Sequence, residues 1–329
     1  MPVTRAVRIA AFGEPAEVVT TEEVPTPEAG PGEVVVRMRV RPVNPSDLSL
    51  MRGRYGQLPP LPATPGLEGM GVVESVGPGA EGVALGARVV PVGVMGTWSE
   101  RVVAPAAQLV PVPDGVGDEA AAQLVVNPLT AWIMLTEELD VQPGEWLLQD
   151  AAGSTLGRVV LQLARLRGFR TINVVRRAEQ AEELRALGAD EVVVSEGEGL
   201  AERVQQITGG AGVAKAMDAV GGVLGARMAD CLAPGGTLLV YGLLSREPLP
   251  LDGRRLIFGG TTVRGFWLTQ WMTQNPPQRV AEAMGTMMRM MAEGTIAPPV
   301  EARYELAEAR AAVAHAERPG RSGKVLLVG

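Results

Sequence analysis

The segment after residue 149 carries residue types suited to binding phosphate. Asp150 begins a run of small residues that ends at Gly157, and an amphipathic run, 159–166, comes next. The preceding apolar run, 146–149, predicts a strand, so the pattern is strand, tight turn and helix start. Such a turn presents backbone N–H groups and the positive end of a helix dipole to a pyrophosphate. Alanine takes the place of the first glycine of Gly-x-Gly-x-x-Gly, so the turn alone is not specific to dinucleotides.

Two arginines follow the next expected strand, 171–175. A site selective for NAD places an acidic residue there to bind the ribose 2′-hydroxyl, whereas Arg176 and Arg177 can hold a 2′-phosphate by charge-assisted hydrogen bonds. The alternative is a pair of solvated arginines at a helix start, where the dipole disfavours positive charge. The sequence therefore favours NADPH over NADH.

Residues 127–265 alternate between strand and helix patterns. The helix expected at 178–187 ends at Gly188, which provides a left-handed cap, and a strand follows at once. Short connections of this kind indicate βαβ units, so we predict a doubly wound, Rossmann-type parallel sheet over 127–265. Its strands are expected at 145–149, 171–175, 191–194, 214–218 and 237–241.

Residues 1–126 contain short β-rich runs separated by glycine and proline, which indicate a partly open β-barrel or coiled sheet. After Gly265 come a helix rich in methionine, a turn at Pro298 and Pro299, another helix and a strand at 324–328. We expect residues 266–329 to rejoin the first domain and the methionines to fill its core. The runs lie at 33–40, 69–76, 87–92 and 99–103.

The composition predicts a two-domain, soluble, cytoplasmic protein. A chain of 329 residues with 46% hydrophobic content exceeds what one core usually organises. The net charge of −7 disfavours nucleic acid and anionic membrane as partners and leaves room for a small anionic ligand. The single cysteine, Cys231, excludes an intrachain disulfide and suits a reducing compartment. No signal peptide or membrane-spanning run is evident.

The residue types of a catalytic zinc site are missing. The layout resembles that of zinc alcohol dehydrogenases, which carry Gly-His-Glu where this chain has Gly66-Leu67-Glu68, and a ligating cysteine near Asn44. Leucine cannot ligate zinc, and the only histidine, His315, is expected on the surface of a C-terminal helix. Without zinc, alcohol oxidation lacks its Lewis acid. The remaining chemistry is hydride delivery to an electrophilic acceptor, such as a conjugated double bond or a quinone.

Seven segments spread over nearly the whole chain match the motifs of one family: Asn44-Pro-Ser-Asp47, Gly53-Arg-Tyr55, Pro65-Gly-Leu-Glu-Gly69, Gly96-Thr-Trp98, Asn127-Pro-Leu-Thr-Ala131, Thr171-Ile-Asn-Val-Val-Arg176 and Arg264-Gly-Phe-Trp-Leu-Thr-Gln-Trp271. They resemble the NADPH-dependent trans-2-enoyl-CoA reductases of mitochondrial fatty acid synthesis and their bacterial relatives, zinc-free members of the medium-chain dehydrogenase/reductase superfamily. The quinone reductases come next, because they share the glycine-tyrosine stretch and the Pro-Gly-x-Glu-Gly turn.

The resemblance implies a GroES-like catalytic domain over 1–126 and 266–329, and it implies residue roles. Tyr55 would be the catalytic tyrosine, and Asn127 would lie beside the nicotinamide. The family often has Asn at Gly153 and a further basic residue at Ala178, so weaker binding of the 2′-phosphate is expected. The remaining cofactor-binding positions would be Asn44, Gly153, Ser154, Thr155, Leu156, Arg176, Arg177, Tyr241, Gly242, Leu243, Leu244, Phe266, Trp267, Leu268, Thr269 and Lys324.

The implied reaction is reduction of the α,β double bond of an enoyl thioester, carried by CoA or acyl carrier protein. Hydride addition at Cβ pushes charge to the thioester oxygen, and the resulting enolate must be stabilised and then protonated at Cα. A phenol suits this task because its usual pKa of about 10 keeps it protonated at neutral pH.

Several of these residues have plain structural alternatives. Tyr55 could only pack against the prolines that follow it. Asn127 with Pro128 has the pattern of a helix N-cap and first helical position, and capping is expected whether or not Asn127 is catalytic. Trp267 and Trp271 could belong to the core or to a dimer contact.

Two other functions stay open. An NADPH:quinone reductase needs the same cofactor domain but no proton donor to carbon, and a non-catalytic NADPH-binding protein needs only the cofactor domain. The strand-like stretch 261–266 could pair across a two-fold axis, so we predict a homodimer.

Overall fold

The computed structural model describes the whole chain except residues 1, 81 and 196–198. The chain forms two compact units. The first contains Met1–Leu129 and Pro277–Gly329, and the second contains Thr130–Pro276. The predicted boundaries, at 126/127 and 265/266, lie three and eleven residues before the observed ones, so residues 266–276 belong to the second unit rather than the first.

The second unit contains a six-stranded sheet in which every neighbouring pair is parallel. The strand order is β10-β9-β8-β11-β12-β13, so the sheet grows outward in both directions from the pair β8 and β11. Ligands of such sheets bind beyond the carboxyl ends of the strands, at the point where the order reverses. The strands are β8 (Trp146–Gln149), β9 (Arg170–Val175), β10 (Glu191–Val194), β11 (Val213–Asp218), β12 (Leu232–Val240) and β13 (Thr262–Gly265).

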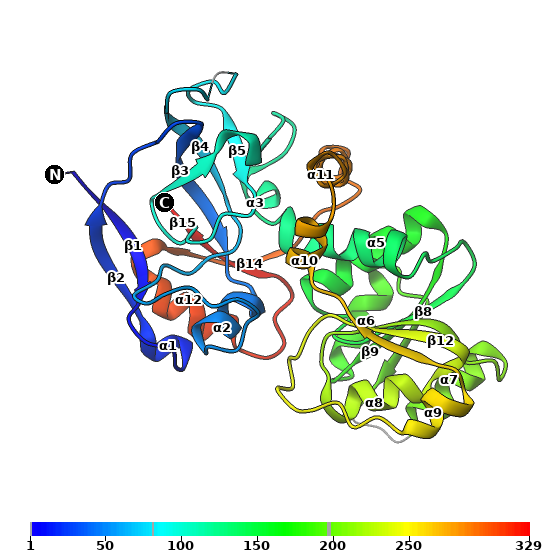
Figure 1. Cartoon of the computed structure of the whole chain (residues 1–329). Coiled ribbons are helices and arrows are strands. Elements are labelled where there is room, and N and C mark those ends of the chain that lie inside the picture. Colours follow the sequence, from blue (N-terminus) through cyan, green and yellow to red (C-terminus); the bar gives the residue numbers. More distant parts are fainter. Residues whose placement is uncertain (1, 81, 196–198) are drawn as a thin grey trace. The chain divides into compact units, whose positions relative to one another are not determined.

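Helices connect these strands and cover both faces of the sheet, with α5 and α8 on opposite faces (Figure 1). The strands are apolar because both faces are covered, and Leu148, Ile172, Ala216 and Leu238 are fully buried at their centre. The helices are α4 (Thr130–Ile133), α5 (Thr155–Arg167), α6 (Glu179–Ala186), α7 (Leu200–Thr208), α8 (Gly222–Asp230), α9 (Gly253–Phe258) and α10 (Leu268–Gln274), with a π-helical turn at Met134–Glu138.

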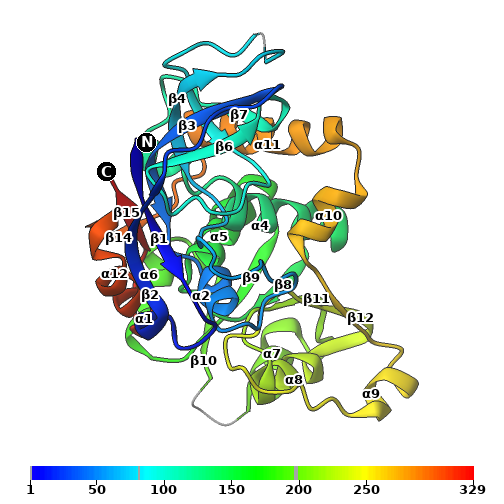
Figure 2. The same cartoon turned by 60° about the vertical axis from the view of Figure 1, so that its left-hand side comes forward.

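The first unit contains a seven-stranded sheet and a separate antiparallel pair of β1 (Val3–Ile9) and β2 (Val19–Pro25) (Figures 1 and 2). The larger sheet runs β14-β15-β3-β4-β5-β7, and β6 also pairs with β3. The C-terminal strand β15 therefore joins the N-terminal strands, as expected. The strands are β3 (Glu33–Pro42), β4 (Met70–Val76), β5 (Arg88–Pro91), β6 (Arg101–Pro105), β7 (Leu109–Pro111), β14 (Val300–Glu305) and β15 (Lys324–Val328).

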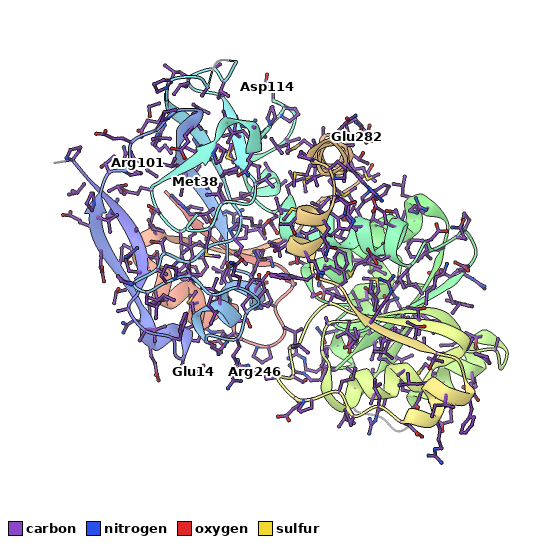
Figure 3. The ribbon with its side chains drawn as sticks, in the orientation of Figure 1. Glu14, Met38, Arg101, Asp114, Arg246 and Glu282 are labelled. Carbon is purple, nitrogen blue, oxygen red and sulfur yellow. The ribbon has the colours of Figure 1, made fainter. Side chains whose placement is uncertain are left out.

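The strands of the first unit place some side chains in the core and others toward solvent. Met38 on β3 is buried, whereas Arg101 on β6 reaches Glu74 at 2.6 Å on the partly exposed side (Figure 3). The helices are α1 (Pro15–Val18), α2 (Pro45–Met51), α3 (Asp118–Ala121), α11 (Pro277–Ala292) and α12 (Ala309–Ala316), with a π-helical turn η2 at Val125–Leu129 and 3-10 turns at Ala106–Gln108 and Leu306–Glu308.

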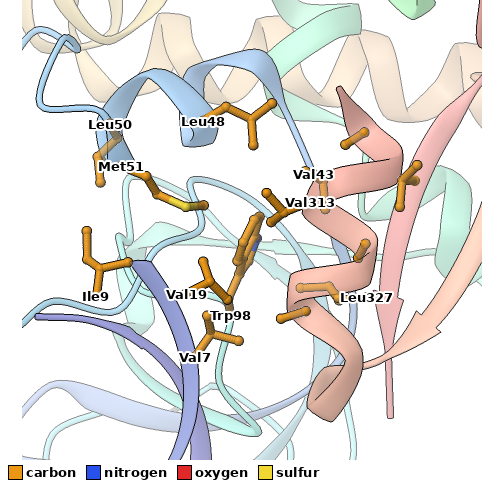
Figure 4. Close-up of a cluster of buried hydrophobic side chains, with 14 of the residues drawn as sticks. Val7, Ile9, Val19, Val43, Leu48, Leu50, Met51, Trp98, Val313 and Leu327 are labelled. Carbon is orange, nitrogen blue, oxygen red and sulfur yellow. The ribbon is translucent and has the colours of Figure 1, made fainter. Parts of the chain in front are cut away.

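An apolar cluster joins α2, α12 and strands β1 and β15 around the fully buried Trp98 (Figure 4). The indole of Trp98 donates to the Pro42 carbonyl at 3.2 Å, so its one polar atom is satisfied. On α11, four of the five methionines are buried, which confirms their predicted role as core residues: Met284, Met287, Met288 and Met291.

The predicted strands and helices of both units are present within a few residues of their expected ends. The difference lies in β12, which begins at Leu232, five residues before the expected start at 237. Among the described residues, none of the helices has the length and apolar character that crossing a membrane requires.

Candidate active site

The first unit buries five polar side chains next to one another, and we call them the polar cluster: Asn44, Asp47, Glu68, Asn127 and Lys324. Asn44 lies at its centre. Its Nδ2 donates to Glu68 Oε1 at 2.9 Å, and its Oδ1 accepts from Lys324 Nζ at 2.7 Å and from Asn127 Nδ2 at 3.3 Å. Segments far apart in the sequence therefore meet at one amide group.

The local fold explains how Glu68 reaches this position. Gly66 has a φ of +106°, and a Cβ there would come within 2.4 Å of both Thr97 Oγ1 and Trp98 Cδ1, so only glycine fits. The Thr97 hydroxyl donates to the Glu68 carbonyl at 2.7 Å. The Pro-Gly-Leu-Glu-Gly turn thus directs the Glu68 side chain into the core, and Thr97 holds the Glu68 backbone.

Burial and mutual charge set the ionisation of the polar cluster. Burial raises the pKa of Asp47 to about 7, against the lowering effect of the Asn44 N–H, which donates to Asp47 Oδ2 at 2.8 Å. Burial also raises the pKa of Glu68. Burial lowers the pKa of Lys324 to about 8, while Glu68 and Asp47 oppose that shift. Below pH 8 the Lys324 ammonium compensates the buried carboxyl charge.

The residues at the positions where zinc alcohol dehydrogenases bind their metal do not fit a metal ion in this chain. Leu67 offers no donor atom and packs against the apolar cluster around Trp98. Asn44 and Glu68 are hydrogen-bonded to each other, and the Asn44 Oδ1 atom accepts from the Lys324 ammonium, a cation supplied by the chain itself. Within the described ranges, no three His, Cys, Asp or Glu side chains gather in a way that could hold a metal ion.

The predicted capping role of Asn127 is wrong. Asn127 and Pro128 lie inside the π-helical turn Val125–Leu129, and the Asn127 side chain bonds Asn44 instead of a backbone N–H. Glu68 Oε2 accepts from the N–H groups of Val125 and Val126 at 3.0 and 2.8 Å, in the manner of an external cap. Asn44, which precedes Pro45, is the residue that occupies an N-cap, at the start of α2.

Tyr55 lies on the loop that follows α2. The helix ends through Gly53, whose φ of +68° lets the Arg54 N–H reach the Ser49 carbonyl at 2.9 Å. Tyr55 is half-buried, and its ring packs against the apolar cluster around Trp98. This packing fixes the ring, and it is compatible both with the structural alternative and with a catalytic hydroxyl.

In the second unit, the predicted phosphate-binding turn lies at the carboxyl end of β8, next to the point where the strand order reverses. Ser154 is the N-cap of α5, and its Oγ accepts from the Gly157 N–H at 3.1 Å. Of the described residues, none accepts a hydrogen bond from the backbone N–H groups of Gly153, Thr155 or Leu156, although all three residues are buried. Unpaired N–H groups at a helix start are what a pyrophosphate requires.

Small residues let the helix approach this turn closely. A Cβ on Gly157 would lie 2.4 Å from the Ala152 carbonyl oxygen, so the contact needs glycine. Ala151 has a φ of +43°, a strained conformation for a residue with a side chain. The turn is therefore a tight backbone cradle that fits the phosphates of a dinucleotide.

Arg176 and Arg177 follow β9, the strand beside β8. Arg176 is exposed and Arg177 is half-buried, and neither pairs with a carboxylate in the described part of the chain. The Arg177 Nε atom is buried without a hydrogen-bond partner there. Guanidinium groups that lack a carboxylate partner among the described residues are suited, at this position, to binding a 2′-phosphate.

The remaining predicted cofactor residues follow β12 and β13 in the same unit. Leu243 and Leu244 are exposed on the loop after β12, whereas the hydroxyl of Tyr241 is buried without a hydrogen-bond partner among the described residues. Phe266 extends β13, because its N–H donates to the Val240 carbonyl at 2.9 Å. Gly242 precedes the leucines, and Trp267, Leu268 and Thr269 form the N-cap and first positions of α10.

Trp271 belongs to the core of the second unit. It lies one helical turn after Trp267 in α10, is 7% exposed, and donates from Nε1 to Glu137 Oε2 at 3.1 Å. The single histidine is also less exposed than expected, since His315 Nδ1 lies 2.9 Å from the Tyr304 hydroxyl and the side chain is half-buried.

The sequence analysis did not identify a pair of buried carboxyls, Asp150 and Asp218, at the carboxyl ends of β8 and β11. Asp150 Oδ1 accepts from the Ala219 N–H at 2.7 Å, and Asp218 Oδ1 accepts from the Val220 and Gly221 N–H groups. Burial and the neighbouring Asp218 raise the pKa of Asp150 well above its usual value. The two Oδ2 atoms are buried and accept no hydrogen bond among the described residues, and the raised pKa favours the protonated form of Asp150.

Comparison with known protein families gives two matches. Residues 30–114 match the alcohol dehydrogenase GroES-like domain, and residues 155–288 match the zinc-binding dehydrogenase family. The two matches and the observed sheets confirm the predicted fold class, a GroES-like domain with a Rossmann-type domain.

Individual relatives match over nearly the whole chain. The mitochondrial enoyl-[acyl-carrier-protein] reductase of Bos taurus is 34% identical over 98% of this chain and 88% of its own length. A crystal structure of a putative NADPH:quinone reductase from Bacillus thuringiensis has a TM-score of 0.93 and 35% identity, with both chains fully covered. The Escherichia coli quinone oxidoreductase complexed with NADPH has a TM-score of 0.91 and 27% identity, covering 99% of this chain and all of its own.

Proposed function

Because the chain belongs to the medium-chain dehydrogenase/reductase superfamily, we propose that it is an NADPH-dependent reductase of 2-enoyl thioesters, carried by CoA or acyl carrier protein. One observation carries the substrate class, namely the similarity over 98% of the chain to mitochondrial enoyl-[acyl-carrier-protein] reductases. The choice of NADPH as cofactor is supported by this chain's own residues, and relatives of known structure bind NADPH.

The second unit supplies the cofactor site. NADPH, when bound, supplies the hydride. The free N–H groups of Gly153, Thr155 and Leu156 would bind its pyrophosphate, and Arg176 and Arg177 would bind its 2′-phosphate. The sequence prediction that Tyr241 to Leu244 and Phe266 to Thr269 flank the nicotinamide is retained in this proposal.

The first unit supplies the groups that act on the substrate. In the reaction, hydride adds to Cβ, the electron pair of the double bond moves to the thioester oxygen, and a proton then adds at Cα. The Tyr55 hydroxyl would hydrogen-bond the developing oxyanion and donate the proton. Asn127 would position the nicotinamide or the thioester by its amide group, and Lys324 holds the Asn44 amide that Asn127 contacts.

A quinone reductase is the second candidate, because the Escherichia coli quinone oxidoreductase shares the fold over the full length. Reduction of a quinone needs no proton donor to carbon. A third candidate, of another class, is a protein that binds NADPH without turnover.

Activity measurements separate these candidates. The purified protein is given NADPH with crotonyl-CoA or with a naphthoquinone, and the same assays are run on Tyr55→Phe. The matched control is Tyr304→Phe, since Tyr304 packs against the same apolar cluster but its hydroxyl contacts His315. We expect turnover of crotonyl-CoA that falls at least tenfold in Tyr55→Phe only. Turnover of the quinone alone, indifferent to Tyr55→Phe, would overturn the proposal, as would tight binding of NADPH with neither activity.

The protein is further proposed to be a homodimer formed through the second unit. β13 is an edge strand of the parallel sheet, and α9, which precedes it, exposes large apolar side chains. Ile257 is 73% exposed and Phe258 is 82% exposed, which suits a surface that a second copy covers. A reducing compartment, the cytoplasm, remains the expected location, and the one cysteine, Cys231, is a buried free thiol.

A further inference from the structure

Glu68 is a fully buried carboxylate whose two oxygens both accept hydrogen bonds. Oε1 accepts from the Asn44 side chain, and Oε2 accepts from the backbone N–H groups of Val125 and Val126. These partners lie 24 residues before Glu68 and 57 and 58 residues after it. The Glu68 side chain thus connects, by hydrogen bonds, the start of α2 and the π-helical turn that contains Asn127.

The hydrogen bonds around Asn44 fix the direction of its amide. Because Glu68 Oε1 is an acceptor, the Asn44 NH₂ group must face it, and the Asn44 Oδ1 atom must face the two donors Lys324 Nζ and Asn127 Nδ2. A reversed amide would place its NH₂ group against an ammonium and another NH₂ group. Glu68 and Lys324 together therefore determine which atom Asn44 offers to Asn127.

Asn127 is in turn oriented from two sides. Its Nδ2 bonds Asn44, and the backbone of the two residues before it is held by Glu68. Its Oδ1 accepts no hydrogen bond from the described residues. The network directs the NH₂ group inward and leaves one acceptor on a buried side chain for a ligand.

We propose that Glu68 is a positioning residue that orients the Asn127 side chain for the cofactor or substrate, through Asn44 and through the backbone at Val125 and Val126. This inference rests on the proposed function, in which Asn127 contacts the bound ligand. The position requires a carboxylate because both of its oxygens must accept; an amide of the same shape would turn a donor toward one of the partners.

The donor and acceptor pattern gives a matched set of variants. Glu68→Gln keeps the shape but opposes a donor to a donor at either Asn44 or the backbone. In the double variant Asn44→Asp with Glu68→Gln, the introduced glutamine accepts from the backbone and donates to the introduced aspartate. That aspartate accepts in turn from Lys324 and Asn127, so the charge moves and every bond is restored. The control is Glu33→Gln, which alters a carboxylate that accepts from a backbone N–H, that of Gly30, outside the polar cluster.

The variants are compared by kcat and KM with crotonyl-CoA, by the Kd of NADPH from fluorescence titration, and by hydrogen exchange of the peptide spanning residues 121–131. We expect Glu68→Gln to lower kcat at least tenfold with a smaller change in KM, to weaken NADPH binding, and to speed exchange. The double variant is expected to recover most of each loss. In an Asn127→Ala background, Glu68→Gln is expected to change kcat and Kd by less than twofold.

A purely structural role would give a different result. Glu68→Gln would then lower the midpoint of thermal unfolding. It would either leave kcat unchanged or lower kcat by the same factor in the presence and absence of the Asn127 side chain. Either of these two results for kcat overturns the inference. If Glu68→Gln does not fold, the folded double variant decides. A near-native kcat and a near-native Kd of NADPH in the double variant support the inference. A tenfold loss of kcat at a native midpoint of thermal unfolding overturns it.

Failure of the proposed function is recognised separately. If the unaltered protein does not reduce crotonyl-CoA, the proposed function fails, and the NADPH titrations decide the role of Glu68. Weaker NADPH binding in Glu68→Gln that disappears in the Asn127→Ala background supports positioning. Equal weakening in both backgrounds overturns it.

Discussion

Replacing Asp150 by asparagine should stabilise the second unit, and by an amount that grows with pH. In the folded protein, burial and the neighbouring Asp218 raise the pKa of Asp150 and favour its protonated form, and neither Oδ2 atom accepts a hydrogen bond among the described residues. An asparagine at 150 reproduces this pattern, because its Oδ1 can accept from the Ala219 N–H and its Nδ2 can donate to Asp218 Oδ2. The variant therefore keeps the hydrogen bonds without the need to bind a proton.

The magnitude follows from proton linkage. The folded-state pKa of Asp150 lies above its unfolded value of about 3.9, so between these two values the folded protein binds one proton more than the unfolded chain. Its stability then falls by about 1.4 kcal/mol for each unit of rising pH. Asp150→Asn lacks this dependence, so its advantage should widen by about 1.4 kcal/mol per unit from about pH 5 up to the folded-state pKa.

Urea unfolding followed by tryptophan fluorescence measures this difference, because four of the five tryptophans lie in the second unit: Trp132, Trp146, Trp267 and Trp271. The double variant Asp150→Asn with Asp218→Asn turns two NH₂ groups toward each other and should lose the gain of Asp150→Asn. A stability difference that is constant with pH, or a double variant as stable as Asp150→Asn, would refute the protonated Asp150.

Three further predictions concern other parts of the chain. Gly157→Ala, which places a Cβ 2.4 Å from the Ala152 carbonyl, should cost about 1–3 kcal/mol in urea unfolding and weaken NADPH binding, whereas Gly285→Ala on α11 meets nothing within 4 Å and should not destabilise. Arg177→Ala and Arg176→Ala should each raise the Kd of NADPH about tenfold or more and leave that of NADH unchanged, as charge-assisted hydrogen bonds of about 1.5–3 kcal/mol require. If the proposed dimer forms, Phe258→Glu should convert it to a monomer in sedimentation, and Leu85→Glu, at a similarly exposed site in the first unit, should not.

The fold was predictable because its signals are local. The parallel strands are rich in apolar residues, and the helix at 179–186 is followed by Gly188, whose φ of +91° matches its expected role as a cap. The early start of β12 was not predictable, since it passes through Pro234, Gly235 and Gly236, which normally indicate a turn.

The two Asn-Pro pairs show where local sequence stops being informative. Asn44-Pro45 and Asn127-Pro128 carry the same helix-start signal, yet only Asn44 occupies an N-cap. At the second pair, the backbone N–H groups before Asn127 bind Glu68, and the Leu129 N–H donates to the Leu124 carbonyl at 3.3 Å, five residues back, so the chain forms a π-helical turn. The outcome depends on a residue 57 positions away from Val125, which no pattern near Asn127 reveals.

The candidate site divides in the same way. The turn at Gly153 to Leu156 and the arginines at 176 and 177 could be predicted from sequence, because each lies close after a strand. The roles of Glu68 and Asp150 were not, although both lie inside motifs that were singled out. Their signal is an acidic residue within an otherwise apolar or small stretch, which predicts burial with a partner but not the identity of that partner.

The two units compensate their buried carboxyls by different means, and this difference determines what each group can do. In the second unit, burial beside Asp218 favours the protonated form of Asp150, so less negative charge lies beside a turn that is suited to an anionic cofactor. In the first unit the Lys324 ammonium lies among Asp47, Glu68 and Asn44, so charge remains and hydrogen bonds acquire a fixed direction. Direction is what a positioned amide needs, because an amide can be reversed without a change of shape and only its partners decide which atom it presents.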